Sequence, residues 1–193
     1  IKPIENVEVE LKFKDLNIRT RTLDDGYFRF DVPYHGELES GWHDYHVSCK
    51  LNGEVGIVGK SELLKPYKSR LGIISDIDDT FLISHSNTVF KKLFVMLSRN
   101  INKRKLFENV VRHYKLLSVA GQDSKAASNS FFYVSSSEWN LYGFINDFAE
   151  IHELPKAVIK LKDNKTGLRD VFTTGLEDHE HKSYKIKDIL SFY

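Results

Sequence analysis

The chain has 193 residues, of which 41% are hydrophobic and 28% are charged, a composition that is typical of globular proteins and excludes disordered and fibrous classes. The formal net charge is +1, so charge does not favour nucleic-acid binding and we predict no nucleic-acid partner. A single cysteine, Cys49, excludes an internal disulfide framework. No apolar run reaches the roughly 18 residues that a membrane-spanning helix needs, so we predict no transmembrane segment.

Residues 1–68 have the pattern of a small all-β domain. Apolar residues alternate with charged ones over 7–13, as in a strand with one buried face. The Asp25-Gly26 pair predicts a hairpin turn, followed by an alternating strand over 27–32. A further strand is predicted over 44–50. Short strands separated by turn residues, without helical periodicity, favour a small β-sandwich.

Residues 69–193 change to apolar strands that alternate with helices. Buried strands are predicted at three short apolar runs: 71–75, 131–134 and 157–159. Helical periodicity is found in four stretches: 89–97, 107–117, 138–150 and 182–192. This alternation indicates a parallel, doubly wound α/β sheet, with a helical insertion at about 84–130 between the first two strands.

The first of these strands ends in a cluster of acids, Asp76, Asp78 and Asp79. In open α/β sheets, ligands bind beyond the carboxyl ends of the strands. Crowded carboxylates there favour a divalent cation such as Mg²⁺, which takes oxygen ligands, and an aspartate can act as a covalent nucleophile. A calcium-like loop or an acidic turn without chemistry is the alternative. The apolar strand before Asp76 and the threonine at Thr80 favour catalysis.

The segment Asp76-Ile77-Asp78-Asp79-Thr80 resembles the first motif of the haloacid dehalogenase superfamily. More narrowly, 74–80 together with 133–142 resembles the catalytic domain of the actin-patch-type phosphatidate phosphatases, which reads ISDIDDT and then YVSSSPWNLY. Glu138 stands where that family usually has proline. Residues 24–28 and 41–43 are also similar to the β-domain that precedes the catalytic domain in bacterial members. The resemblance implies a Rossmann-like, haloacid-dehalogenase-type fold for residues 69–193.

The resemblance also implies a role for each matching residue. Asp76 would be the nucleophile and a Mg²⁺ ligand, and Asp78 would be the general acid and base with its backbone carbonyl on the metal. Thr80 would steady the loop beside the substrate phosphate. Ser135 would donate a hydrogen bond to the phosphoryl oxygens. Lys182, ahead of the last helix, would bind the phosphate, and a cation and a hydroxyl at strand ends can stabilise charge on a phosphoryl group.

Two of these residues, Ser135 and Lys182, also have alternative structural roles. Ser135 could be a helix-start serine, and Ser136 could bind the phosphate in its place. Lys182 could be a solvated helix lysine like its neighbours Lys185 and Lys187.

The family's metal site also includes acids that follow the last helix, in a strand ending in Gly-Asp and a few residues beyond it. This chain ends at Tyr193, before that strand, and Asp188 lies inside the predicted last helix. Either the chain is a fragment or the metal site is incomplete, and in both cases we predict that this polypeptide alone binds Mg²⁺ poorly.

Two further stretches carry weaker signals. Residues 177–181 are rich in acids and histidines, and we predict a charged loop there and not a metal site. Residues 90–105 mix apolar and basic side chains. They could lie on an anionic membrane, although we favour a helix packed on the core with its lysines in water.

The resemblance implies a Mg²⁺-dependent phosphatidate phosphatase. It would form an aspartyl-phosphate and release diacylglycerol and phosphate. We expect a cytoplasmic protein that works at the membrane surface where phosphatidate lies. A phosphatase acting on a soluble phosphomonoester and a non-catalytic interaction module remain open as alternatives, because substrate choice depends on loops that the sequence does not explain.

Overall fold

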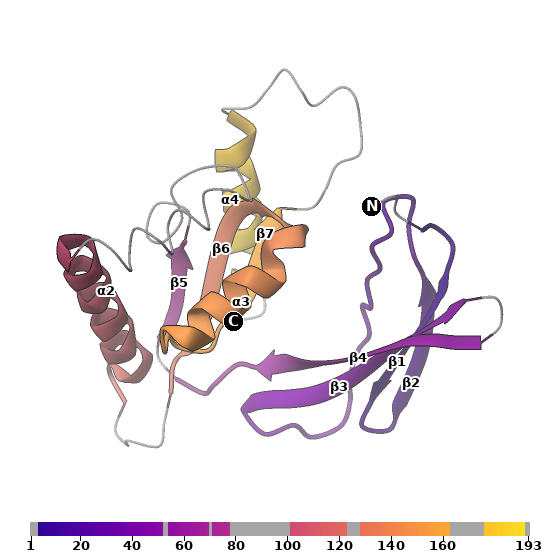
Figure 1. The fold of residues 1–193 in the computed structure, drawn as a ribbon. Helices are drawn as coiled ribbons and strands as arrows, with labels where there is room; N and C mark the ends of the chain where they lie inside the picture. The colour runs from indigo at the N-terminus through magenta and orange to yellow at the C-terminus, as the bar shows by residue number, and fades with distance from the viewer. Residues whose placement is uncertain are drawn as a thin grey trace. The chain divides into compact units, whose positions relative to one another are not determined.

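The computed structural model of the chain describes residues 4–51, 54–69, 71–77, 101–122, 128–162 and 176–191. It divides into two compact units, Ile1–Pro66 and Tyr67–Tyr193 (Figure 1). Each unit has its own sheet and is described by itself.

The first unit is a four-stranded antiparallel sheet with strand order β2-β1-β3-β4. Its strands are β1 Glu8–Phe13, β2 Leu16–Arg21, β3 Gly41–Leu51 and β4 Glu54–Lys65. A two-residue turn joins β1 to β2, and Lys14 in that turn has a φ of 53°, as tight hairpins require. The alternating run predicted over 7–13 and the strand predicted over 44–50 are confirmed by β1 and β3.

The two faces of this sheet differ in chemistry because side chains alternate along a strand. Val9 and Phe13 of β1 are buried on the apolar face, where Phe13 packs edge-on against Tyr34 at 5.5 Å between ring centroids. The opposite face carries charged residues in cross-strand contact, with Arg19 on β2 donating to Glu10 on β1 at 3.0 Å. The antiparallel register places these charges beside one another.

Two predictions for this unit are wrong. The described residues form one sheet and not the two sheets of a sandwich. The turn at Gly26 does form, because the Leu23 amide donates to the Tyr27 carbonyl at 2.7 Å, but residues 27–32 are not a strand. Phe28 and Val32, which would share a face of such a strand, are 42% and 37% exposed. Residues 27–32 pair with none of the strands in the described sheet, so pairing does not bury one side of their apolar alternation.

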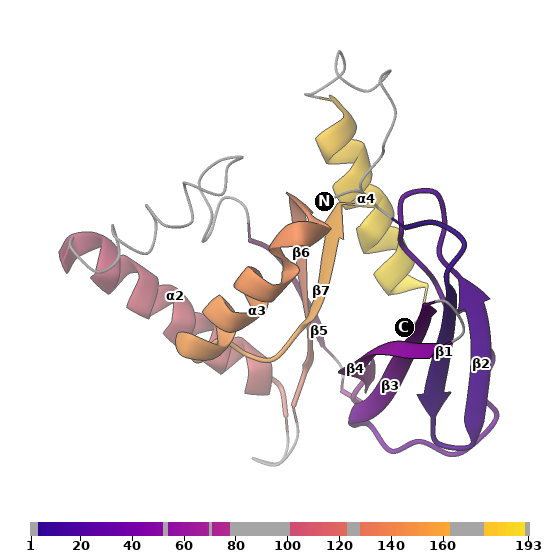
Figure 2. The same cartoon turned by 45° about the vertical axis from the view of Figure 1, so that its right-hand side comes forward.

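The second unit has a three-stranded parallel sheet with order β5-β6-β7, which confirms the predicted parallel α/β pattern. The strands are β5 Gly72–Asp76, β6 Ser130–Glu138 and β7 Val158–Lys162. The helices are α2 Ile101–Val119, the 3₁₀ turn η1 Trp139–Leu141, α3 Tyr142–Ile151 and α4 Leu176–Leu190. Helices α2 and α3 cover one face of the sheet and α4 covers the other (Figures 1 and 2).

The core of this unit lies between the sheet and the α2–α3 layer. Phe131 and Tyr133 of β6 are buried there, against Tyr114 of α2 and Ile145 of α3. On the other face, Ile189 of α4 is buried. The near-continuous apolar run of β6 is explained by helices on both faces, since a strand covered on both sides exposes neither set of side chains.

Element boundaries in the second unit correct three predictions. Strand β6 continues through the serines to Glu138, and α3 begins only at Tyr142, after the η1 turn. Helix α4 begins at Leu176, so residues 177–181 are helical and the predicted loop is wrong. The basic stretch over 90–99 lies outside the described residues.

Candidate active site

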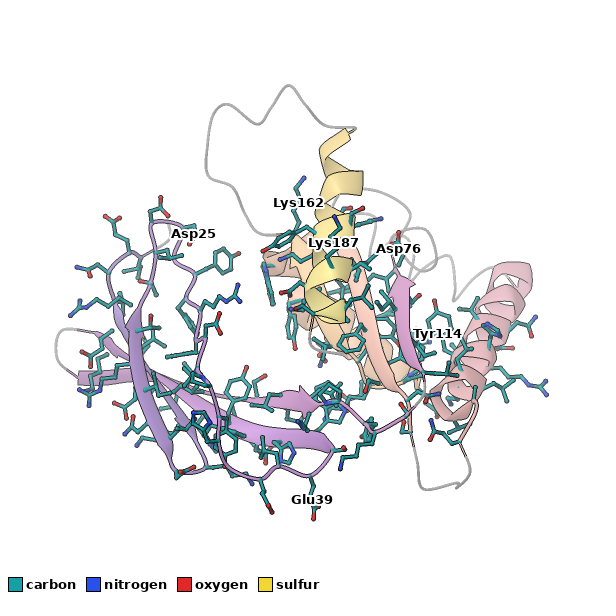
Figure 3. The ribbon with its side chains drawn as sticks, turned by 180° about the vertical axis from the view of Figure 1, so that it is seen from behind. Asp25, Glu39, Asp76, Tyr114, Lys162 and Lys187 are labelled. Atoms are coloured by element: carbon teal, nitrogen blue, oxygen red, sulfur yellow. The ribbon has the colours of Figure 1, made fainter. Side chains whose placement is uncertain are left out.

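Asp76 is the last residue of β5 and lies at the carboxyl end of the parallel sheet (Figure 3). Successive side chains of a strand point to opposite faces, and the contacts of β5 follow this rule. Ser75 bonds to Tyr114 of α2, and Asp76 bonds to Lys182 of α4. The nucleophile candidate therefore faces the α4 side of the sheet.

Lys182 is the closest charged partner of Asp76 that the structure describes. Its Nζ donates to the Asp76 Oδ2 at 2.6 Å, across 106 positions of sequence. The Lys182 side chain is 22% exposed and that of Asp76 is 41% exposed, so the pair lies at the surface of the sheet end with the lysine more covered. This contact contradicts the solvated-lysine alternative. Lys182 lies within α4 and not ahead of the last helix, because α4 starts six residues earlier than predicted.

A second ion pair holds the other end of α4 to the same face of the sheet. Lys160 Nζ of β7 donates to the Asp188 Oδ2 at 2.8 Å. In the sheet register, Asp76 lies beside Val134, and Val134 lies beside Lys160. Asp188 lies inside the last helix, as predicted, and its carboxylate forms an ion pair with Lys160.

Ser135 follows the regular part of β6, at the same end of the sheet as Asp76. It is fully buried, and its Oγ accepts a hydrogen bond from the Ser137 amide at 3.0 Å. The strand register shifts between Val134 and Glu138, so this bond supports an irregular strand end. The helix-start reading of Ser135 is wrong, because the residue before α3 is Leu141 and no side chain caps that helix. Its phosphate-binding role stays a prediction, as does that of Ser136.

Asp78 and Thr80 lie outside the described residues, so their predicted roles rest on the motif. In the part of the chain that the structure describes, no three histidine, cysteine or acidic side chains gather as a metal site. Asp76 supplies one carboxylate at the surface of a strand end. Its oxygens are of the kind that Mg²⁺ prefers, and Mg²⁺ commonly binds through one or two carboxylates with waters and substrate phosphate. The donor chemistry of Asp76 therefore fits Mg²⁺.

The sequence did not identify the part that Tyr114 and Ser75 play beside Asp76. The Tyr114 hydroxyl and Ser75 Oγ form a hydrogen bond, and Ser75 Oγ donates to the backbone carbonyl of Asp76 at 3.2 Å. Tyr114 also stacks on Tyr133, at 6.3 Å between centroids. Burial raises the pKa of the Tyr133 phenol, and the nearby Tyr114 adds to that rise. Sequence periodicity predicts a core position for Tyr114 but cannot show where its hydroxyl points.

Comparison with protein families adds an independent finding. The family model described as phosphatidate phosphatase APP1, catalytic domain, matches residues 71–193, which is more than half of the chain and includes Asp76, Ser135 and Lys182. A search of curated proteins finds no match. Among the described residues, none of the helices is long and apolar enough to cross a membrane.

Proposed function

Because this chain belongs to the family of phosphatidate phosphatase APP1 catalytic domains, we propose that it hydrolyses phosphatidate to diacylglycerol and phosphate in a Mg²⁺-dependent reaction. The observation that supports this best is the 2.6 Å contact between Lys182 Nζ and Asp76 Oδ2. It brings a cation from the last helix to the carboxylate at the end of β5, where α/β sheets bind their ligands.

In the proposed first half-reaction, Asp76 is the nucleophile. Lys182 holds one carboxylate oxygen, so the orientation of Asp76 is set before substrate arrives. A carboxylate oxygen attacks phosphorus, a bond from Asp76 to phosphorus forms, and the bond from phosphorus to the glycerol oxygen breaks. Asp78 donates a proton to that leaving oxygen, which gives diacylglycerol.

The second half-reaction reverses the roles of acid and base. Asp78, now ionised, takes a proton from a water molecule as that water attacks phosphorus. The bond between phosphorus and Asp76 breaks, phosphate leaves and the Asp76 carboxylate is restored. In both steps the Lys182 ammonium stabilises negative charge on the phosphoryl oxygens, and Ser135 and Thr80 add hydrogen bonds to the phosphate.

Mg²⁺ would be held by the Asp76 carboxylate and the Asp78 backbone carbonyl. It would neutralise charge on the substrate phosphate. Because phosphatidate is a membrane lipid, we propose that the protein works in the cytoplasm at a membrane surface.

The proposal is tested by measuring phosphate release from phosphatidate vesicles and from a panel of soluble phosphomonoesters, with and without Mg²⁺. We expect release from the vesicles, by this chain or by a C-terminally extended form, that chelation abolishes and that Asp76→Asn lowers by at least roughly a thousandfold. Asp188→Asn is the matched control, because it removes an acid from the other ion pair of α4 and should keep activity.

Other outcomes would change the proposal. Release from soluble esters alone would replace the lipid substrate with a soluble one. No release by the folded protein, alone or in a C-terminally extended form, would favour the non-catalytic interaction module.

A further inference from the structure

Two consecutive residues at the end of β5 are held from opposite faces of the sheet. Lys182 of α4 bonds to the Asp76 carboxylate on one face. Tyr114 of α2 bonds to the Ser75 hydroxyl on the other. The two helices belong to different layers (Figure 2), so the strand end is fixed by both layers at once.

On the α2 side, two hydrogen bonds connect Tyr114 through the Ser75 hydroxyl to the backbone carbonyl of Asp76. Ser75 has a single hydroxyl proton, which it donates to the Asp76 carbonyl at 3.2 Å. In the hydrogen bond between Ser75 and Tyr114, the tyrosine is therefore the donor and Ser75 the acceptor. Chains of hydroxyl groups polarise one another in a region of low dielectric constant. The bond from Tyr114 thus strengthens the bond that Ser75 makes to the backbone of Asp76.

The position of Tyr114 is set by the core of the unit. Its ring is buried between Phe131, at 5.5 Å between centroids, and Tyr133, at 6.3 Å. Ser75 and Tyr133 are partners in the strand register and share a face. Packing of the Tyr114 ring against Tyr133 therefore holds the Tyr114 hydroxyl beside Ser75.

We propose that Tyr114 is a positioning residue for the nucleophile, which acts through Ser75 on the backbone of Asp76. This inference rests on the proposed function of Asp76. The Asp76 carbonyl precedes Ile77 and the rest of the motif, so a change in its direction rotates the peptide that leads from the nucleophile towards Asp78. Tyr114 lies on α2, within the insertion between β5 and β6, so packing of that insertion is coupled to the geometry of the nucleophile.

A matched control lies in the same core. Tyr133 is also a buried tyrosine of this cluster, but its hydroxyl donates to the Pro155 carbonyl at 3.0 Å, away from β5. Tyr114→Phe and Tyr133→Phe each remove one buried hydroxyl and keep the ring. A purely structural role for Tyr114 predicts similar consequences for the two variants.

The experiment compares Tyr114→Phe, Ser75→Ala, their double variant, Ser75→Thr and Tyr133→Phe in the full chain. We expect kcat on phosphatidate vesicles to fall roughly three- to tenfold in Tyr114→Phe, as loss of one hydrogen bond would give, with KM changed less than about twofold. The double variant should be no worse than the more affected single variant, because both break one chain. Ser75→Thr keeps the hydroxyl and should keep kcat, and Tyr133→Phe should keep kcat while losing stability.

A second readout does not depend on activity. The Ile77 amide donates to the Val134 carbonyl at 3.2 Å, so its hydrogen exchange reports on the strand end. After correction for global stability, exchange at Ile77 should be faster in Tyr114→Phe and Ser75→Ala and unchanged in Tyr133→Phe. Unchanged exchange, an unchanged kcat in an active enzyme or additive losses in the double variant would overturn the inference. Absence of turnover in every form would reject the proposed function, and the exchange measurement would still decide whether Tyr114 positions the strand end.

Discussion

The antiparallel sheet of the first unit and the parallel sheet of the second both hold opposite charges in contact, but at different places. In the first unit several pairs lie across neighbouring strands, as in Lys60 with Asp44 at 2.9 Å, where both side chains are more than half exposed. In the second unit two pairs join α4 to strands that are distant in sequence, and their side chains are more covered than those of Lys60 and Asp44.

The two kinds of lysine–carboxylate ion pair therefore form for different reasons. Strand register alone brings the charges of the first unit together, and exposed pairs of this kind contribute little to stability. The two pairs of α4 require a helix and two strands to pack in one arrangement. The Lys182 pair defines what lies beside Asp76, so its removal should affect function more than the removal of any cross-strand pair.

The largest expected effect is a loss of activity that distinguishes the two ion pairs of α4. Lys182→Met should lower kcat by roughly a hundredfold, because it removes a cation that stabilises charge on the transferring phosphoryl group. Lys160→Met removes the other pair, 2.8 Å from Asp188, and should leave most of the activity. Steady-state phosphate release from phosphatidate vesicles measures both. Equal losses would show that the two lysines only hold α4 in place.

The second prediction concerns a buried polar residue of the parallel unit. The Asn129 amide donates to the carbonyls of Leu117 and Ala120 at 2.8 and 2.9 Å, at the carboxyl end of α2. Replacing it with leucine leaves these helix-end carbonyls without that donor, and Asn129→Leu should lower the free energy of unfolding by about 2 kcal/mol. Urea unfolding measures the change. The control is Ser128→Ala, whose longer contacts predict a much smaller loss.

The third prediction concerns pH. Burial lowers the pKa of His152, whose ring packs against Phe148 at 4.4 Å between centroids. The unfolded chain therefore binds a proton more readily than the folded protein does, and stability is present above the ordinary histidine pKa and is lost as pH falls through the lowered one. The midpoint of urea unfolding should drop between about pH 7.5 and pH 5.5. His152→Leu should flatten that drop, and an equal drop in the variant would assign it to other groups.

The smallest effect is expected in the first unit. Asp44 raises the pKa of Lys60 through a hydrogen bond and through its negative charge. The variant Lys60→Ala removes this exposed partner of Asp44. The unfolding midpoint should stay within experimental error of the unchanged protein, in low salt and in high salt. A loss as large as that of Asn129→Leu would show that the cross-strand pairs contribute more than register alone suggests.

Local periodicity determined much of the fold from the sequence. Alternation over 7–13 predicts β1, and the apolar runs predict β5, β6 and β7, because burial of one or both faces of a strand leaves a direct pattern in the residues. Strand β4 was not predicted as a separate strand. Its glycines and its exposed Val58 weaken the alternation that a half-buried strand would show.

The sequence also predicts where the chemistry lies. An apolar strand that ends in Asp76 predicts a ligand site at that edge of a parallel sheet, and the structure places Asp76 at the end of β5, beside β6. Sequence alone could not decide which of Lys182, Lys185 and Lys187 would reach it. The packing of α4 on the sheet makes this choice, because it places the Lys182 Nζ 2.6 Å from the Asp76 carboxylate.

Only the tertiary structure decided which side chains meet across the sheet. It left the alternating run over 27–32 outside the first sheet, carried β6 through its serines, and brought Tyr114 and Lys182 to adjacent residues of β5. The physical reason is that a periodic pattern specifies which face of an element is buried. The partner that covers that face depends on how helices and strands distant in sequence pack together.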